Sequence, residues 1–95
     1  MYEEYTAQFI GREVEITGSR NPTYTGISGR VIDETRNTLL VGHGNRSTRI
    51  PKKSVTFRIM PEGTVINGRY VCLTPEERMK QFRRIERAIR KGEEL

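Results

Sequence analysis

Short runs in which apolar and polar residues alternate, separated by turn residues, constrain the fold of this chain more than any other feature. The clearest run places Val55, Phe57 and Ile59 on one face of an extended segment and polar residues between them. A period of two is typical of a half-buried strand, whereas a helix repeats about every 3.6 residues. The pattern therefore predicts a thin, mostly β core.

Further strands are predicted at residues 13–17, 27–33, 38–41 and 47–50, each bounded by turn residues. Residues 60–63 suit a type I turn, and Asn67-Gly68 is typical of a two-residue hairpin. About six short antiparallel strands joined by tight turns predict a small, bent sheet that closes into a barrel, because closure removes exposed edges. We expect Gly29 to mark a bend or a close approach of two backbones.

Both ends of the chain switch to a helical pattern. A short helix is predicted before Gly11, and nine residues are too few to be stable without packing. Near the other end Thr74, Pro75 and Glu77 form a capping box, and Gly92 is a plausible helix end. We therefore expect one domain over residues 1–95: an N-terminal helix or partly disordered segment at 1–11, the barrel at 12–73 and one C-terminal helix at 74–92.

The predicted C-terminal helix has two different faces. Turning each residue by about 100° gathers Met79, Phe82, Ile85 and Ile89 on one side and most of the basic residues on the other. The apolar side can pack on the barrel or dock another protein. The basic side can be solvated or can face RNA, and the pattern leaves both possibilities open.

The net charge points to a polyanionic partner. The chain has 17 Lys and Arg against 12 Asp and Glu, which gives +5 at pH 7, and nucleic acid is the first candidate for such a surface. Arg46, Arg49, Lys52 and Lys53 occupy successive loop and strand-end positions, where a barrel would present them along one rim. Phosphate contacts there would give salt-dependent affinity with little sequence readout.

Few residues suit catalysis or metal binding. Cys72 is the only cysteine, so it has no disulfide partner in the chain, and with His43 alone it cannot build a zinc site. Neighbouring Asp33 and Glu34 would point to opposite faces of a strand, so their carboxylates cannot bind the same magnesium ion. His43 is expected in a glycine-flanked loop. There it can be a solvated residue or can contact RNA. No apolar run approaches the roughly 18 residues that cross a bilayer, so we expect a soluble, cytoplasmic protein.

Several strings of the sequence carry a family resemblance. They are the segment from Asn21 to Leu39, which contains Asp-Glu-Thr-Arg-Asn-Thr-Leu, then Ile50-Pro51-Lys52-Lys53, Gly68 and Pro75-Glu76-Glu77-Arg78. Their order and spacing resemble the archaeal ribonuclease P protein component 1 over most of the chain, from Phe9 to Lys80. One departure is Thr74, where the family usually has arginine, so a contact made by that arginine is not carried over.

The resemblance implies an Sm-like barrel with terminal helices and a role in removing the 5′ leader from precursor tRNA. It also implies that an RNA subunit holds the magnesium ions and performs hydrolysis, so that this chain binds no cofactor. The implied partners are ribonuclease P RNA, precursor tRNA within the holoenzyme, a zinc-ribbon protein subunit that forms a heterodimer with this chain, and the other ribonuclease P proteins. The family's docking through terminal helices, together with the apolar stripes, nominates Tyr5, Phe9, Phe82, Ile85 and Ile89 as partner contacts.

The resulting hypothesis is a non-catalytic, RNA-binding subunit of ribonuclease P. The candidate phosphate contacts are Arg46, Arg49, Lys52, Lys53, Arg83, Arg84 and Arg87. Further candidates are Arg30, Arg36 and Arg69, although strand arginines can instead pair with Glu13, Glu15 or Asp33. The alternatives are a free Sm-like RNA chaperone that forms its own ring and, less favoured by the residues present, a protein-only nuclease.

Overall fold

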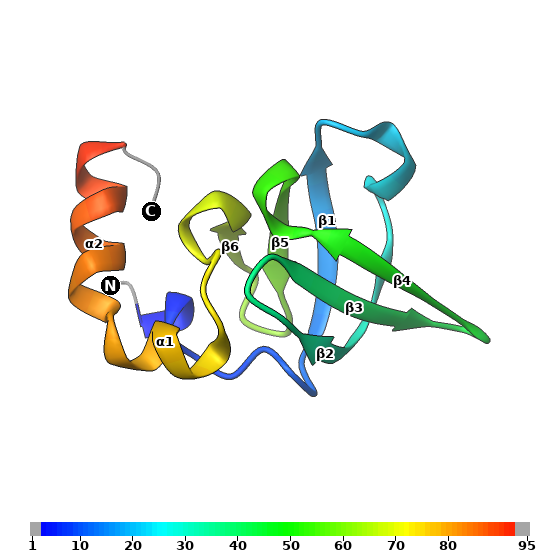
Figure 1. Ribbon diagram of the computed structural model, residues 1–95. Coiled ribbons are helices and arrows are strands. Elements are labelled where there is room, and N and C mark those ends of the chain that lie inside the picture. The colour runs from blue at the N-terminus through cyan, green and yellow to red at the C-terminus, as the bar shows by residue number, and fades with distance from the viewer. Residues whose placement is uncertain (1–2, 93–95) are drawn as a thin grey trace.

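The protein is a six-stranded antiparallel sheet with its two α-helices at one end (Figure 1). The structure is a computed structural model, and it describes residues 3–92. The strands are β1 (Glu13–Ser19), β2 (Ser28–Glu34), β3 (Thr38–His43), β4 (Arg46–Pro51), β5 (Val55–Ile59) and β6 (Thr64–Asn67). The helices are α1 (Pro75–Lys80) and α2 (Phe82–Lys91), with single 3₁₀ turns η1 (Glu3–Tyr5), η2 (Pro22–Tyr24), η3 (Lys52–Ser54) and η4 (Gly68–Tyr70).

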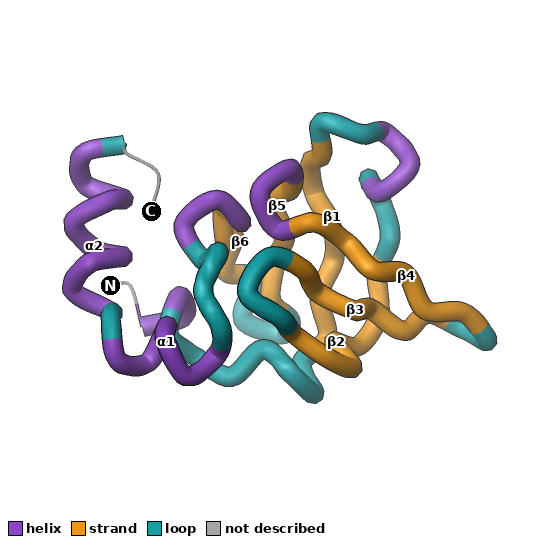
Figure 2. Tube along the Cα trace, in the orientation of Figure 1, coloured by secondary structure: helices purple, strands orange, loops and turns teal. Residues whose placement is uncertain are grey.

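The strands are hydrogen-bonded in the order β4-β3-β2-β1-β5-β6. The expectation of a mainly β fold with about six antiparallel strands is confirmed. The expected closed barrel is not found, because β4 and β6 end the order and do not pair with each other within residues 3–92. The course of the six strands and of the turns between them is drawn in Figure 2.

The sheet is strongly bent, and its concave face encloses the main core. Every strand contributes at least one buried residue to one cluster, including Ile16, Val31, Leu39, Phe57 and Ile66. The register shifts between Ile16 and Gly18 and between Val31 and Asp33, and such bulges bend strands. Phe9, from the segment before β1, seals this core edge-on against Phe57 at 5.4 Å between ring centroids.

Gly29 marks a close approach of two backbones, as expected. A Cβ atom there would lie 1.9 Å from the carbonyl oxygen of Gly42 on β3. That distance is far inside van der Waals contact, so only glycine lets β2 and β3 cross the bend together.

A second, smaller cluster attaches the helices. Tyr70 and Leu73 pack against Ile85 and Ala88 of α2, with Tyr5 at the margin. Thr74 and Glu77 form the expected capping box, and Gly92 ends α2 in the left-handed conformation. The expected single helix is wrong, however, because Gln81 interrupts it with φ −113° and ψ 31°. The break lets α1 face the sheet while α2 packs on η4 and Leu73.

Two other local expectations are also wrong. The described part of the N-terminal segment contains only the turn η1 in place of a helix up to Ile10, and Tyr2 lies outside the described residues. Asn67-Gly68 does not form a hairpin: the Asn67 side chain accepts from the Arg69 N–H and begins η4. A third expectation, the type I turn at residues 60–63, is not fulfilled either: the Met60–Pro61 bond is cis, and the Gly63 N–H donates to the carbonyl of Ile59, one residue before the predicted acceptor.

Candidate functional site

The outer face of the sheet is largely neutralised by cross-strand ion pairs. Arg30 lies 3.4 Å from Glu13, and Arg58 lies 3.2 Å from Glu15. Arg36 likewise donates to Glu77 at 2.8 Å. The alternative that strand arginines pair with nearby carboxylates therefore holds for Arg30, and Arg36 pairs with a carboxylate of α1. These charges offer less to a polyanion than unpaired cations would.

Other basic side chains are exposed and have no carboxylate within ion-pair distance among the described residues. They fall in three regions: the β3–β4 hairpin, α2, and the loop after β1. The members of this set are Arg20, Arg46, Arg49, Arg83, Arg84, Arg87 and Lys91. Arg20 and Lys91 were not among the predicted phosphate contacts, and Arg20 was missed because it is a single charge in a polar loop.

The β3–β4 hairpin carries Arg46 and Arg49. Arg49 donates to the Thr38 hydroxyl at 2.9 Å, and His43 Nε2 lies 2.8 Å from the Thr48 hydroxyl. The hairpin tip projects away from the helices (Figure 1). Because β4 rises about 3.3 Å per residue, Arg46 at its start is well separated from Lys53 beyond its end. The expected single rim of Arg46, Arg49, Lys52 and Lys53 is therefore not formed.

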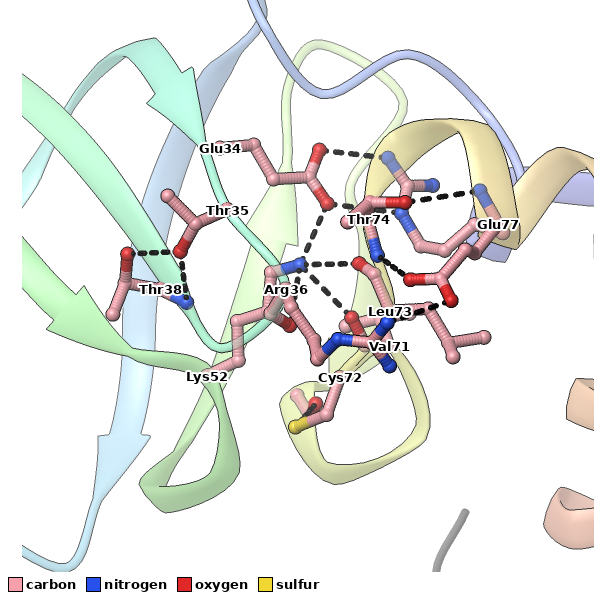
Figure 3. A network of polar contacts seen from close by, with 12 residues as sticks. Glu34, Thr35, Arg36, Thr38, Lys52, Val71, Cys72, Leu73, Thr74 and Glu77 are labelled. Carbon is pink, nitrogen blue, oxygen red and sulfur yellow. Dashed lines mark hydrogen bonds and ion pairs between the residues drawn. The ribbon is translucent and has the colours of Figure 1, made fainter.

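Lys52 is not available to phosphate, which corrects the prediction for this residue. Its side chain is fully buried, and Nζ donates to Glu34 at 2.7 Å and to the carbonyls of Val71 and Leu73 at 2.9 Å each (Figure 3). It also donates to the Arg36 carbonyl at 3.2 Å. Burial lowers the pKa of Lys52, and the adjacent Glu34 carboxylate opposes that shift.

Arg78 completes a buried charge cluster with Glu34 and Lys52. Its Nη2 and Nε donate to the two Glu34 oxygens at 2.8 and 3.0 Å. Its Nη1 donates to the carbonyls of Tyr5 and Ala7 at 2.9 and 2.7 Å, and the guanidinium stacks 3.8 Å from the centroid of the Phe9 ring. Sequence reasoning assigned Arg78 no role, although it ends one of the strings that carry the family resemblance. The cluster ties the N-terminal segment and α1 to the sheet.

The five nominated partner contacts are not one exposed surface. Phe9 and Ile85 are fully buried within this chain, which corrects their assignment as surface contacts. Tyr5 is half-buried, and its hydroxyl accepts from the Asn67 N–H at 3.3 Å. Ile89 is partly buried against the second cluster. Phe82 is 49% exposed, and its neighbour Met79 is 66% exposed. Of the five nominated residues, Phe82 is therefore the exposed one, and it lies with Met79 at the α1–α2 junction.

The helix α2 has a buried apolar face and an exposed basic face, and the basic residues lie on the side that the sequence predicts. Ile85 and Ala88 are buried, whereas Arg83, Arg84 and Arg87 are exposed. Arg84 bonds only the Gln81 side chain, at 2.9 Å, in the described residues. The exposed half of α2 is thus cationic along its length.

Lys53 and Arg69, two more predicted phosphate contacts, lie together with Arg20 at the end of the sheet where β1 stops. They line one shallow hollow of about 370 Å³. Arg69 also lies over the Tyr70 ring, 4.8 Å from its centroid, and donates to the Tyr70 hydroxyl at 2.6 Å. Three cations from three separate loops are therefore brought into one place.

Residues 3–92 contain no group of three or more His, Cys, Asp or Glu side chains arranged to hold a metal ion. The same residues include no helix long and apolar enough to cross a membrane. Cys72 is half-buried, and its thiol contacts the Gly68 carbonyl at 3.5 Å.

Fold and surface together define a small β protein with helical ends and unpaired surface cations. Residues 5–81 match the family model described as Ribonuclease P/MRP, subunit p29. The chain therefore belongs to this family of ribonuclease P protein components.

Individual proteins with similar sequences support the same family assignment. It is 40% identical over 77 residues to ribonuclease P protein component 1 of Methanosphaera stadtmanae, covering 78% of this chain and 83% of that one. It is 38% identical over 87 residues to the same component of Thermoplasma acidophilum, covering 92% and 98%. A solved structure of Mth11, a homologue of human RNase P protein Rpp29, matches with a TM-score of 0.55 and 40% identity over 75% of this chain and 96% of that one.

Proposed function

We propose that this chain is a non-catalytic, RNA-binding subunit of ribonuclease P that helps to remove the 5′ leader from precursor tRNA. The observation that carries the proposal is the set of exposed cations without acidic partners in the described part of the chain, on a member of a ribonuclease P protein family. Lys and Arg side chains placed in this way neutralise phosphates and release counterions. The bond cleavage belongs to the RNA subunit and its magnesium ions.

The phosphate contacts in this proposal are Arg46 and Arg49 on the β3–β4 hairpin, Arg83, Arg84 and Arg87 on α2, and Lys53. Lys52 is left out because it is buried. Arg30 and Arg36 are secondary because each already has a carboxylate partner. The groups lie on separate elements, so the RNA would be held at several points of its backbone rather than in one groove.

The proposed zinc-ribbon partner docks on the α1–α2 junction. Phe82 and Met79 provide exposed apolar area there, with Tyr5 and Ile89 at the margin. Phe9 and Ile85 are left out because both are buried, Phe9 in the main core and Ile85 in the second cluster. Co-purification of the two proteins tests the contact: Phe82→Ala should weaken the complex, whereas Val65→Ala, at an exposed apolar residue on β6, should leave it intact.

Reconstitution tests the function itself. Adding this protein to the ribonuclease P RNA of the same organism and its other protein subunits should lower the magnesium concentration needed to cleave precursor tRNA. An unchanged magnesium requirement would contradict the proposal. The same assay without the RNA subunit tests the protein-only nuclease, which predicts cleavage by the protein alone.

A ring-forming RNA chaperone is the second candidate, because the sheet leaves the edges of β4 and β6 unpaired within residues 3–92. Such a ring needs the two edges to pair between copies. Arg46 and Arg49 on β4 oppose that pairing, since charged edge residues discourage strand addition. Native mass measurement distinguishes the two: a monomer or a one-to-one heterodimer supports the ribonuclease P subunit, and a closed homo-oligomer supports the chaperone.

A further inference from the structure

A shallow hollow at one end of the sheet combines positive charge with neutral hydrogen-bonding groups. Three separate segments form it: the end of β1, the turn η3 with the start of β5, and the end of β6 with η4. The residues that line this hollow, called the basic hollow below, are Gly18, Ser19, Arg20, Lys53, Ser54, Val55, Thr56, Asn67 and Arg69. Three of these nine are cations, and none is acidic.

The floor of the basic hollow is fixed by backbone pairing. Gly18 is paired with Thr56 across β1 and β5, and Thr56 is paired with Asn67 across β5 and β6. The Arg20 N–H donates to the Ser54 carbonyl at 2.9 Å. The turn η4 sits directly on η3, since a Cβ atom on Gly68 would lie 1.9 Å from the Lys52 carbonyl oxygen. The three segments therefore hold their side chains at set positions before any ligand arrives.

The chemistry of the lining matches a sugar-phosphate unit. Arg20, Lys53 and Arg69 supply positive charge, and the Arg69 guanidinium is held in place by its Nη2 bonds to the Tyr70 hydroxyl at 2.6 Å and the Gly92 carbonyl at 3.2 Å. Asn67 uses its carbonyl oxygen for the Arg69 N–H, which leaves its amide NH₂ to donate. The hydroxyls of Ser19, Ser54 and Thr56 add donors and acceptors of the kind that bond phosphate oxygens and ribose hydroxyls. Small polar residues keep the space open between the cations.

The size of the basic hollow limits what it can hold. Its volume of about 370 Å³ is near the lower end of the range for ligand pockets, roughly 300–1,000 Å³. A double helix cannot enter, whereas one nucleotide of a backbone that turns sharply or is single-stranded can. Recognition of such RNA segments is the usual way in which proteins contact RNA outside its regular helices.

We propose that the basic hollow seats one internal phosphodiester of the RNA, with Arg20, Lys53 and Arg69 around its charge. This inference rests on the proposed RNA-binding function and makes it specific to one site. It assigns a role to Arg20, which belongs to none of the surfaces described for the hairpin or α2. Arg46, Arg49 and the α2 arginines hold neighbouring phosphates independently.

Salt-dependent binding to the ribonuclease P RNA tests the proposal with the full chain. Arg20→Ala combined with Lys53→Ala should reduce the slope of log K against log salt concentration by up to about one unit, since the hollow holds one phosphate and each lost phosphate contact removes about one. Arg58→Ala combined with Lys80→Ala is the matched control, because it removes the same positive charge from two side chains outside the basic hollow, each near a glutamate. The control should keep the wild-type slope.

A second variant changes the hollow without deleting a side chain. Ser19 accepts a hydrogen bond from the Asn21 N–H at 3.1 Å, and an aspartate oxygen can accept the same bond. Ser19→Asp should therefore fold normally, with unchanged melting temperature, and bind RNA more weakly because it places a negative charge beside the phosphate. Gln8→Glu makes the same charge change at an exposed residue in the segment before β1, outside the basic hollow. This variant should bind RNA like wild type.

The outcomes separate this inference from the proposed function. If wild type binds the RNA with a steep salt slope and both hollow variants bind with the wild-type affinity and slope, the assignment of a phosphate to the basic hollow is wrong. The proposed RNA-binding function then still stands. If wild type does not bind the RNA, both are overturned.

The source of the phosphate is tested by NMR. A short oligouridylate with hydroxyls at both ends should shift the amides of Ser19, Arg20 and Ser54. Shifts seen only with inorganic phosphate or with a 5′-phosphorylated oligonucleotide would overturn the assignment to an internal phosphodiester.

Discussion

The side chains of Lys52 and Lys53 leave the same turn for opposite environments. Lys52 points inward to Glu34 and three carbonyls, and Lys53 lies on the rim of the basic hollow. A buried ammonium is stable only when its hydrogen-bonding capacity is met and its charge is paired. All four of its acceptors come from segments distant in sequence, so Lys52 is part of the packing of the molecule.

Replacing each lysine separately distinguishes its contribution to stability from its contribution to RNA binding. Lys52→Met should lower the free energy of unfolding by about 3–5 kcal/mol, the range for breaking a buried ion pair, because Glu34 and three carbonyls lose a donor. Lys53→Ala should lower the urea midpoint far less than Lys52→Met does, because Lys53 is exposed, and should flatten the salt dependence of RNA binding by up to about one unit. Urea unfolding and filter binding at several salt concentrations measure the two effects. A normal midpoint for Lys52→Met would contradict the structural role assigned to this residue.

At the level of elements, α1 depends on its capping box. Thr74 Oγ1 accepts from the Glu77 N–H at 3.2 Å, and the Glu77 carboxylate accepts from the Thr74 N–H at 2.9 Å. These contacts lower the pKa of Glu77 below its ordinary value of 4.5, the Thr74 backbone N–H first, with the Thr74 side chain and the Arg36 guanidinium adding to it. The cap also positions the next turn of α1, which carries Arg78 toward Glu34.

The lowered pKa of Glu77 predicts a pH dependence of stability. When a folded carboxyl has a lower pKa than the unfolded one, the unfolded chain takes up the proton first as pH falls. The stabilisation by Glu77 is therefore complete above its ordinary pKa and is lost as pH falls through the folded value. Glu77→Gln keeps a capping side chain without titrating, so its stability should fall less steeply than that of wild type between about pH 5 and pH 2. Parallel pH slopes in thermal unfolding would contradict this.

The elements that could be predicted from the sequence are those with local signals. The alternation around Phe57, the capping box at Thr74 and the close approach at Gly29 are each encoded within a few residues, and all three were predicted. The break at Gln81 has no such signal, since neither glycine nor proline marks it. It arises because Arg78 and Ile85 have separate anchors, Glu34 and the cluster around Tyr70. Gly68 in turn resembles a hairpin residue and instead provides space for the Lys52 carbonyl.

In the candidate site, too, the sequence predicts the features that have a local signal and misses those that depend on distant segments. Clustering along the sequence identified the arginines of α2 and of the β3–β4 hairpin as exposed cations. It could not separate Lys52 from Lys53, because burial depends on Glu34, Val71 and Leu73, which come from other parts of the chain. Arg20 was missed for the converse reason: it is isolated in sequence and gains its neighbours Lys53 and Arg69 only when three loops meet.

Across the whole molecule, charges are sorted by position. Carboxylates pair with arginines and lysines on the outer face of the sheet and in the buried charge cluster, whereas the hairpin, α2 and the loop after β1 carry exposed cations. A net charge of +5 is thereby concentrated on surfaces that can reach a polyanion. The buried Arg78 on α1 joins the sheet and the N-terminal segment to that helix at the same time.

Replacing Arg78 should therefore uncouple the helical end from the sheet. In Arg78→Met the carbonyls of Tyr5 and Ala7 lose their donor and Glu34 keeps only Lys52, a change expected to cost about 3–5 kcal/mol. The loss should be concentrated in the segment before β1 and in α1 and α2, because the sheet retains its own core. Hydrogen exchange measures this distribution: amides at Ile85 and Ala88 should lose protection while those of β1 and β3 keep most of theirs. A uniform loss across all six strands would show that helices and sheet unfold as one unit, and that Arg78 stabilises the whole rather than joining two parts.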